Sequence, residues 1–357
     1  MANDMRSGHT SSVVRRIVLG AMVVIGAFMF VLPLATNLPG KSAASGDLMT
    51  SFRPQMTNAA LAQGAADQHT MAAMGSQLNT VMLPALAAQM HMTPAQLSAY
   101  LAANFPSVGS GMAQFSTILT HFGSLQSTMA AQQSNFQQAD QIPTGFLPPT
   151  SMTLLFLIPG GLLIVLGVIG LTRQRAARAM VALTTAVGLV VVAGLLAVSM
   201  YSKASAADHM TTAFAPVFGT QSVQQMRADT TTVEAMATEF TQKTLPAIAT
   251  SLHMTPAQLS ALVTQQFPAV ATGVAQLPQI VQRMAAATAL VENNVNNYNQ
   301  SASIPWSPGS MVTMFWLMMV PGLLAVFAGA GALVVGGGRR RVASQPIPRA
   351  HAGAMHS

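Results

Sequence analysis

Four long apolar stretches constrain this chain more than any other feature of its sequence. They cover residues 17–36, 151–172, 179–200 and 310–335, and none of them contains Asp, Glu, Lys, Arg or His. A helix needs about 20 apolar residues to cross the ~30 Å hydrocarbon core of a bilayer. The sequence therefore predicts an all-α integral membrane protein with four transmembrane helices.

The first apolar stretch has an alternative interpretation as a cleaved signal peptide, because Arg15 and Arg16 precede it. It is longer than the usual apolar region of a signal peptide, and no small-residue cleavage pattern follows it. We therefore interpret it as a retained membrane anchor.

Basic residues are concentrated in the short segments next to the apolar stretches. Three short segments carry ten basic residues and one acid, whereas two long loops carry six basic residues and eight acids. The positive-inside rule predicts that the short segments, including both termini, are cytoplasmic and that both loops lie outside the plasma (inner) membrane. The net charge of +7 then reflects topology, and we expect no nucleic-acid partner. The short segments are residues 1–16, 173–178 and 336–357, and the loops are residues 37–150 and 201–309.

A nine-residue motif occurs twice in the chain. His91–Ala99 recurs unchanged as His253–Ala261, so the numbers of matching positions differ by 253 − 91 = 162, which we call the repeat offset. The repeat offset also pairs Phe52 with Phe214. An internal repeat of this kind predicts two tandem units, residues 17–172 and 179–335, each with a helix out, an extracytoplasmic domain and a helix back. Because both units enter from the same side, they are expected to be parallel repeats.

The loops are rich in Ala, Gln, Met and Thr, which favours helices over strands. Longer helices are expected over about 55–90 and 108–135, with counterparts in the second loop. The repeated motif predicts the start of a shorter helix, with Thr at the N-cap, Pro at the first helical position and Gln at the third. The residues concerned are Thr93, Pro94 and Gln96, and Thr255, Pro256 and Gln258.

Proline and glycine recur at equal depth in the second and fourth apolar stretches. Pro159-Gly160 and Pro321-Gly322 are interpreted as static kinks rather than hinges, because no ionisable residue accompanies them. Gly160 and Gly167 share one helix face, as do Gly322 and Gly329. We expect these two glycine faces to pack the two repeat units against each other.

Metal binding and catalysis are not predicted. Met90-His91-Met92 resembles a soft copper ligand set. However, Met90 corresponds to Leu252 in the second copy, an exchange that favours core packing. The acids of the loops are interpreted as scattered, with no acid matching an acid in the other copy. Cysteine is absent, and no catalytic motif is recognisable, so we expect neither enzyme activity nor a cofactor.

Two functions remain open after these exclusions. The first is a non-enzymatic scaffold or accessory subunit of a bacterial cell envelope, whose paired helical domains bind an extracytoplasmic protein. The second is the binding or transport of a lipid or another hydrophobic molecule by those domains. Ion-coupled transport is the weakest hypothesis, because the apolar stretches lack ionisable groups. The lipid bilayer is the expected surrounding, and the sequence does not predict an oligomeric state.

Overall fold

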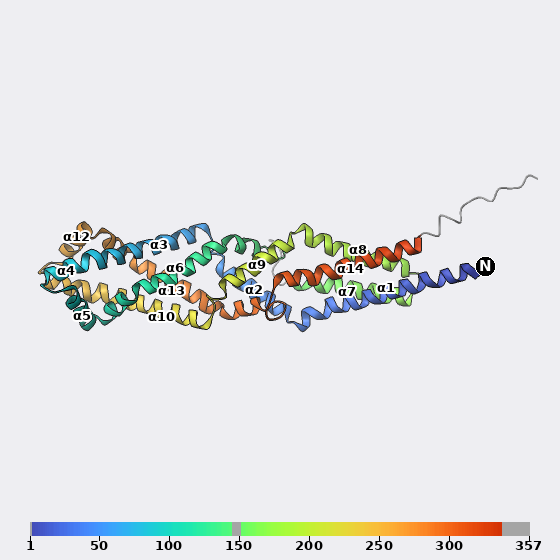
Figure 1. The fold of residues 1–357 in the computed structure, drawn as a ribbon, viewed down its shortest axis with the longest axis horizontal. Helices are drawn as coiled ribbons and strands as arrows, with labels where there is room; N and C mark the ends of the chain where they lie inside the picture. Colours follow the sequence, from blue (N-terminus) through green and yellow to red (C-terminus); the bar gives the residue numbers. More distant parts are fainter. Residues whose placement is uncertain (1, 145–150, 338–357) are drawn as a thin grey trace, which may run out of the picture. The chain divides into compact units, whose positions relative to one another are not determined.

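The computed structural model describes residues 2–144 and 151–337, and these residues form helices without any strand (Figure 1). The described chain divides into two compact units. An apolar unit contains residues up to 42, 142–204 and those from 304 onward; a head unit contains residues 43–141 and 205–303. Each unit therefore combines segments from both halves of the chain. The predicted cytoplasmic tail lies almost entirely outside the described residues, which end at residue 337.

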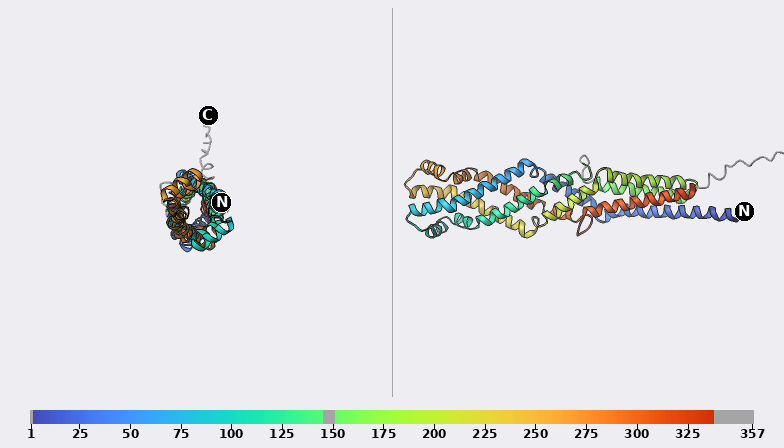
Figure 2. Two further views of the ribbon diagram at one scale, coloured as in Figure 1. Left: turned by 90° about the vertical axis from the view of Figure 1, so that its left-hand side faces the viewer. Right: turned by 45° about the horizontal axis from the view of Figure 1, so that its top comes forward.

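The apolar unit contains four helices that are long and apolar enough to cross a membrane. Contacts join α1 to α7, α7 to α8, α8 to α14 and α14 to α1, so the four helices form a closed ring (Figures 1 and 2). The prediction of an all-helical chain with four candidate membrane-spanning helices is thereby confirmed. The helices are α1 (Ala2–Ala35), α7 (Ser151–Thr172), α8 (Ala177–Ala197) and α14 (Met311–Gly337).

Glycine allows α1 and α7 to approach backbone to backbone. A Cβ atom on Gly26 of α1 would lie 2.7 Å from the carbonyl oxygen of Gly160 on α7, and a Cβ on Gly160 would lie 2.9 Å from the carbonyl oxygen of Gly26. The helices α8 and α14 meet in the same way, since a Cβ on Gly188 would lie 2.8 Å from the carbonyl oxygen of Gly322. Small residues at a helix crossing allow this close packing.

The prediction that the glycine faces join the two repeat units is wrong. A Cβ on Gly167 would meet Val23 of α1, and one on Gly329 would meet Thr185 of α8. These glycines therefore pack each apolar helix against its partner from the same half of the chain. Bulkier side chains join the two halves, in a buried cluster drawn from α1, α7 and α14 that contains Met22, Met29, Leu163 and Ala325.

Pro159 and Pro321 lie inside α7 and α14, and both helices continue through them.

The turns that follow α1 and α8 are alike in the two halves. Asn37 follows α1 and Ser199 follows α8, and each has a positive φ of 52°. The sequence did not predict the helices that begin after these turns, because short polar residues there obscured the helical pattern.

The head unit is built around four long helices that lie side by side (Figures 1 and 2). Contacts join α3 to α6, α6 to α10, α10 to α13 and α13 to α3. The pair of helices from the first half, α3 and α6, therefore lies beside the pair from the second half, α10 and α13, in a closed ring. The long helices are α3 (Asn58–Gln77), α6 (Pro106–Ala139), α10 (Thr220–Glu239) and α13 (Pro268–Ala302). The shorter ones, of which α2 and α9 begin in the apolar unit, are α2 (Leu38–Phe52), α4 (Leu83–Gln89), α5 (Pro94–Asn104), α9 (Met200–Phe214), α11 (Leu245–Ser251) and α12 (Pro256–Gln266).

The helix expected over 55–90 is interrupted by a π-helical turn at Leu78–Met82 between α3 and α4. A second π-helical turn lies at the matching positions of the other half, Phe240–Thr244. Helix propensity does not distinguish a π turn from an α turn, so the sequence did not predict either one. The helix expected over 108–135 lies within α6, which is longer at both ends.

The repeated nine-residue motif forms a tight corner between two helices. His91 ends the first helix with a φ of 56°, and the N–H of Met92 donates to the carbonyl of Ala87 at 2.8 Å. Thr93 then begins α5: its hydroxyl accepts from the N–H of Gln96 at 3.2 Å, while the Gln96 side chain accepts from the Thr93 N–H at 2.8 Å. This is a reciprocal capping box, with Pro94 at the first helical position.

The second copy of the motif has the same geometry. His253 has a φ of 55°, and Thr255 and Gln258 form the same two hydrogen bonds at the start of α12, where Pro256 is the first helical residue. The exposed His91 and His253 side chains therefore belong to residues that stop a helix.

Candidate binding pocket

The core of the head unit is rich in methionine and is continuous across both halves of the chain. Its buried methionines are Met71, Met74, Met82, Met236 and Met284. Two of them pack on glycines of the opposite half: Met236 fills the space beside Gly111, and Met74 fills the space beside Gly273. Flexible thioether side chains fit such irregular gaps between helices.

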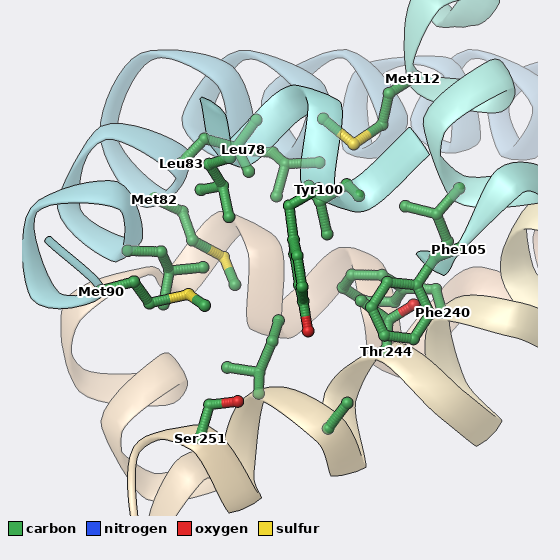
Figure 3. Close-up of a pocket in the computed structure, with 16 residues that line it drawn as sticks. Leu78, Met82, Leu83, Met90, Tyr100, Phe105, Met112, Phe240, Thr244 and Ser251 are labelled. Carbon is green, nitrogen blue, oxygen red and sulfur yellow. The ribbon is translucent and has the colours of Figure 1, made fainter. Parts of the chain in front are cut away.

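One small cavity lies where α4, α5 and the two π-helical turns meet (Figure 3). Tyr100 stands in its centre, with Met82 and Met90 on one side and Phe105 and Phe240 on the other (Figure 3). Its volume is about 20 Å³, which is space for roughly one water molecule. This end of the head unit is therefore filled by its own side chains.

Each half of the chain caps a helix of the other half. The Glu239 carboxylate accepts hydrogen bonds from the backbone N–H groups of Ser107 and Val108, at 2.7 and 3.0 Å, at the start of α6. The N-cap of α6 is Phe105, which has no side-chain acceptor of its own. Glu239 thus satisfies donors that the local sequence leaves open, and its negative charge is favourable at a helix N-terminus.

Gln77 forms the corresponding cap on α13. Its side-chain oxygen accepts from the N–H groups of Ala269 and Val270, at 2.8 and 3.0 Å. Gln77 and Glu239 occupy matching positions of the two halves, and each precedes a π-helical turn. A neutral amide and a carboxylate therefore perform the same structural task in the two halves.

Glu239 has a perturbed pKa. Burial favours its neutral form, but the hydrogen bonds from Val108 and Ser107, together with Lys243, outweigh burial and lower the pKa below its usual value. The folded head therefore favours the ionised carboxylate.

Two buried carboxylates connect the halves, one through an ion pair with an arginine and one through a hydrogen bond with a histidine. Asp67 accepts two hydrogen bonds from the Arg283 guanidinium, at 2.5 and 2.7 Å. Asp229 lies 2.7 Å from the Nδ1 atom of His121. Both acids are buried, with exposed fractions of 8% and 2%. Each also accepts from a glutamine one turn earlier in its helix, at 2.8 Å. These glutamines are Gln63 and Gln225.

These pairs correct the interpretation that no acid matches an acid in the other copy. Asp67 and Asp229 are separated by the repeat offset (229 − 67 = 162), and so are His121 and Arg283 (283 − 121 = 162). Reading the repeat offset through the whole loop, beyond the nine-residue motif, would have identified both pairs as counterparts. Their direct contact across the two halves was not visible in the sequence.

A larger pocket lies between α3, α6 and α13, with a volume of about 210 Å³. Its apolar wall includes Phe52, Met71, Phe122, Met129, Ile280 and Met284. Its polar groups include Gln63, Gln68, Gln126, Asp67 and Arg283. An apolar wall with a few polar groups at defined places is the usual composition of a small-molecule site.

Gly64 accounts for part of the open space. A side chain at this position of α3 would project at Gln126, whose amide oxygen would lie 2.5 Å from the new Cβ. The counterpart of Gly64 in the second half is Met226, which is buried. The counterparts of Gln68 and Gln126 are Thr230 and Thr288, whose buried hydroxyls are hydrogen-bonded at 2.8 Å. In the second half, the matching positions are thus occupied by the large side chain of Met226 and by the hydrogen-bonded pair of Thr230 and Thr288.

Aromatic side chains close a separate part of the head unit. Phe218 stacks on Tyr298 with ring centroids 4.3 Å apart, and Phe52 meets Phe218 edge to face. The Tyr298 hydroxyl donates to the Thr211 carbonyl at 2.6 Å, and burial raises the pKa of this hydroxyl. The cavity beside these rings is only about 20 Å³.

None of the capping, kink and glycine-face residues that the sequence predicted lines the large pocket. Thr93, Pro94, Gln96, Thr255, Pro256 and Gln258 form the two helix corners, and Pro159, Gly160, Gly167, Pro321, Gly322 and Gly329 lie in the apolar unit. Within residues 2–144 and 151–337, no group of three or more His, Asp or Glu side chains is arranged to hold a metal ion.

Comparison with protein-family models gives no match, and comparisons with curated proteins and with solved structures give none either.

Proposed function

We propose that this chain is a non-enzymatic, multi-pass membrane protein of a bacterial cell envelope that acts as a scaffold or accessory subunit. In this proposal the chain consists of two tandem parallel repeats, and its paired helical domains form one head outside the plasma membrane. The four apolar helices are compatible with a membrane-embedded protein. The arginine-rich short segments support cytoplasmic termini.

The observation that best supports a scaffold is the reciprocal connection of the two halves within the head unit. Glu239 and Gln77 each cap a helix of the other half, and Asp67 and Asp229 each pair with a side chain of the other half. Contacts of this kind order the two halves into a single platform, and a preordered surface loses less entropy when a partner binds.

The topology is tested by cysteine labelling in intact cells. Because the chain contains no Cys, a single introduced thiol reports one position. We expect Ala95→Cys to react with an impermeant maleimide and Arg175→Cys to react only after permeabilisation. The reverse pattern would remove the proposed topology and, with it, the extracytoplasmic platform.

The scaffold function is tested by crosslinking in the native membrane. A photo-reactive amino acid at exposed positions of α5 or α12, such as Ala95 or Ala257, should yield a reproducible adduct with one envelope protein. The same group at Val190, an exposed position of α8, serves as the control for contacts made within the bilayer. Adducts with lipids or self-adducts only, from every head position, would argue against a scaffold.

A second candidate function is the binding of a hydrophobic molecule by the head unit. The pocket between α3, α6 and α13 supports it, because the wall is largely apolar and the volume exceeds that of a packing defect. Native mass spectrometry of the full-length protein in mild detergent should show a copurified molecule of constant mass. Protein released from several detergents without any such mass would contradict this candidate.

A further inference from the structure

We infer that the pocket between α3, α6 and α13 holds the chain of an uncharged, single-chain amphiphile, such as a fatty alcohol or a neutral acyl ester. The inference rests on the second candidate function and specifies its ligand class. It uses the size of the pocket, the charge balance of its wall and the neutral polar groups that its ligand would meet.

The size of the pocket limits the ligand to one chain. An apolar cavity of ~150 Å³ holds a molecule the size of benzene. At about 210 Å³ this pocket is somewhat larger, which is enough for a medium-length alkyl segment but not for two acyl chains. Met71, Met129 and Met284 contribute adaptable side chains that fit a flexible chain.

The charges in the wall favour an uncharged ligand. Asp67 and Arg283 both line the pocket, and they neutralise each other through two hydrogen bonds. An anionic ligand would have to compete with Asp67 for the guanidinium, and a cationic ligand would have to compete with Arg283 for the carboxylate. Either exchange would leave a buried or partly buried charge without its partner, which is costly.

Glutamine amides supply the polar contacts that such a ligand needs. Gln126 lines the pocket and donates through Nε2 to the Leu61 carbonyl at 2.6 Å, while its side-chain oxygen lies on the side of Gly64. Gln68 also lines the pocket. An amide offers both donor and acceptor groups without charge, which matches a hydroxyl or an ester group.

The ligand class is tested on the full-length protein in phosphatidylcholine nanodiscs. The probe is 1-decanol with a photoactivatable diazirine in its chain, and labelled positions are mapped by mass spectrometry. We expect labels on α3, α6 and α13 beside the pocket. Unlabelled 1-decanol should compete at least about tenfold better than decanoate or decyltrimethylammonium, a difference of roughly 1.4 kcal/mol.

The pocket is then filled with side chains that the second half carries at the matching positions. Gly64→Met combined with Gln126→Thr should reduce labelling about tenfold, which corresponds to roughly 1.4 kcal/mol of binding free energy. Ala65→Met adds the same side chain to the neighbouring, exposed position of α3 and should leave labelling unchanged. If the double variant is poorly folded, Ala286→Phe is the second variant, because it adds bulk to the pocket wall from α13 and leaves Gly64 and Gln126 unchanged in the sequence.

Each failure has its own meaning. Equal labelling of the filled and the original pocket would overturn the assignment of the site. Stronger competition by decanoate or by the ammonium compound would overturn the neutral class but would retain hydrophobe binding. Absence of pocket labels with neutral, anionic and cationic probes alike would remove both the ligand class and the second candidate function.

Discussion

At the scale of single residues, the same position in the two halves often carries a different side chain for the same task. Gln77 and Glu239 each cap the N-terminus of a helix from the other half, one as an amide and one as a carboxylate. The chain therefore contains both a neutral cap, Gln77, and a charged cap, Glu239, at matching positions, and the two can be compared directly.

Glu239→Gln should make the head less sensitive to acid. The pKa of Glu239 is lowered on folding from its usual 4.5, so its ionisation stabilises the folded head above that pH and this contribution is lost as pH falls through the lower folded value. The introduced amide would keep the cap at every pH, as Gln77 does. Thermal unfolding at pH 7 and pH 3.5 should show a loss that is smaller by a few degrees than in the original protein. An equal loss in both proteins would contradict the assigned cap.

His91→Gly should stabilise the chain. His91 ends its helix at a φ of 56°, where a residue with a Cβ is strained and glycine is not, so we expect a gain of about 0.5–1 kcal/mol. His69→Gly is the matched control, because His69 is exposed within α3 and glycine there should cost about 1 kcal/mol. Thermal or denaturant unfolding gives both values, and the same sign for the two variants would refute the account of the corner.

At the scale of elements, the sequence predicted what depends on local chemistry. The four apolar helices follow from uninterrupted apolar runs, and the capping residues Thr93 and Thr255 begin helices because the hydroxyl, Pro and Gln act within one turn. The pocket could not be predicted in this way, because Gly64, Gln126 and Arg283 come from three helices. The π-helical turns and the glycine contacts depend equally on tertiary packing.

Gly26→Leu should disrupt the packing of α1 on α7. A Cβ on Gly26 would meet backbone atoms of Gly160 and Ile164, which cannot move aside as a side chain can. We expect a loss of about 1–3 kcal/mol, or a shift of the helices. Gly20→Leu on the same helix is the control, since nothing lies within 4 Å of a Cβ there. Thermal stability in detergent measures both, and comparable losses would argue against a specific crossing.

At the scale of the whole chain, contact between the two halves within each unit is the dominant pattern. In each unit every long helix contacts one long helix from its own half and at least one from the other. The repeat offset indicated that two similar segments exist, but it did not reveal how they pack against each other. Each half is an incomplete structure by itself, because its caps and its buried acids find their partners in the other half.

The two halves should therefore assemble when they are made as separate chains, and one ion pair should control that assembly. If residues 1–174 and 175–357 are coexpressed, we expect them to copurify from membranes. Asp67→Arg in the first fragment should weaken recovery, because two cations then face each other; a partly buried pair of this kind contributes about 1–3 kcal/mol. Arg283→Asp in the second fragment should restore recovery when combined with Asp67→Arg.

The exposed pair Arg53–Asp140 provides the control for this exchange. Both residues belong to the first fragment, and the side chain of Arg53 is 59% exposed, so reversing that pair should change copurification little. Rescue by the Asp67–Arg283 exchange with no effect of the control would show that the contact acts between the halves. If Asp67→Arg does not change the amount of the second fragment that copurifies with the first, then apolar packing alone, through the shared methionine core, holds the two halves together.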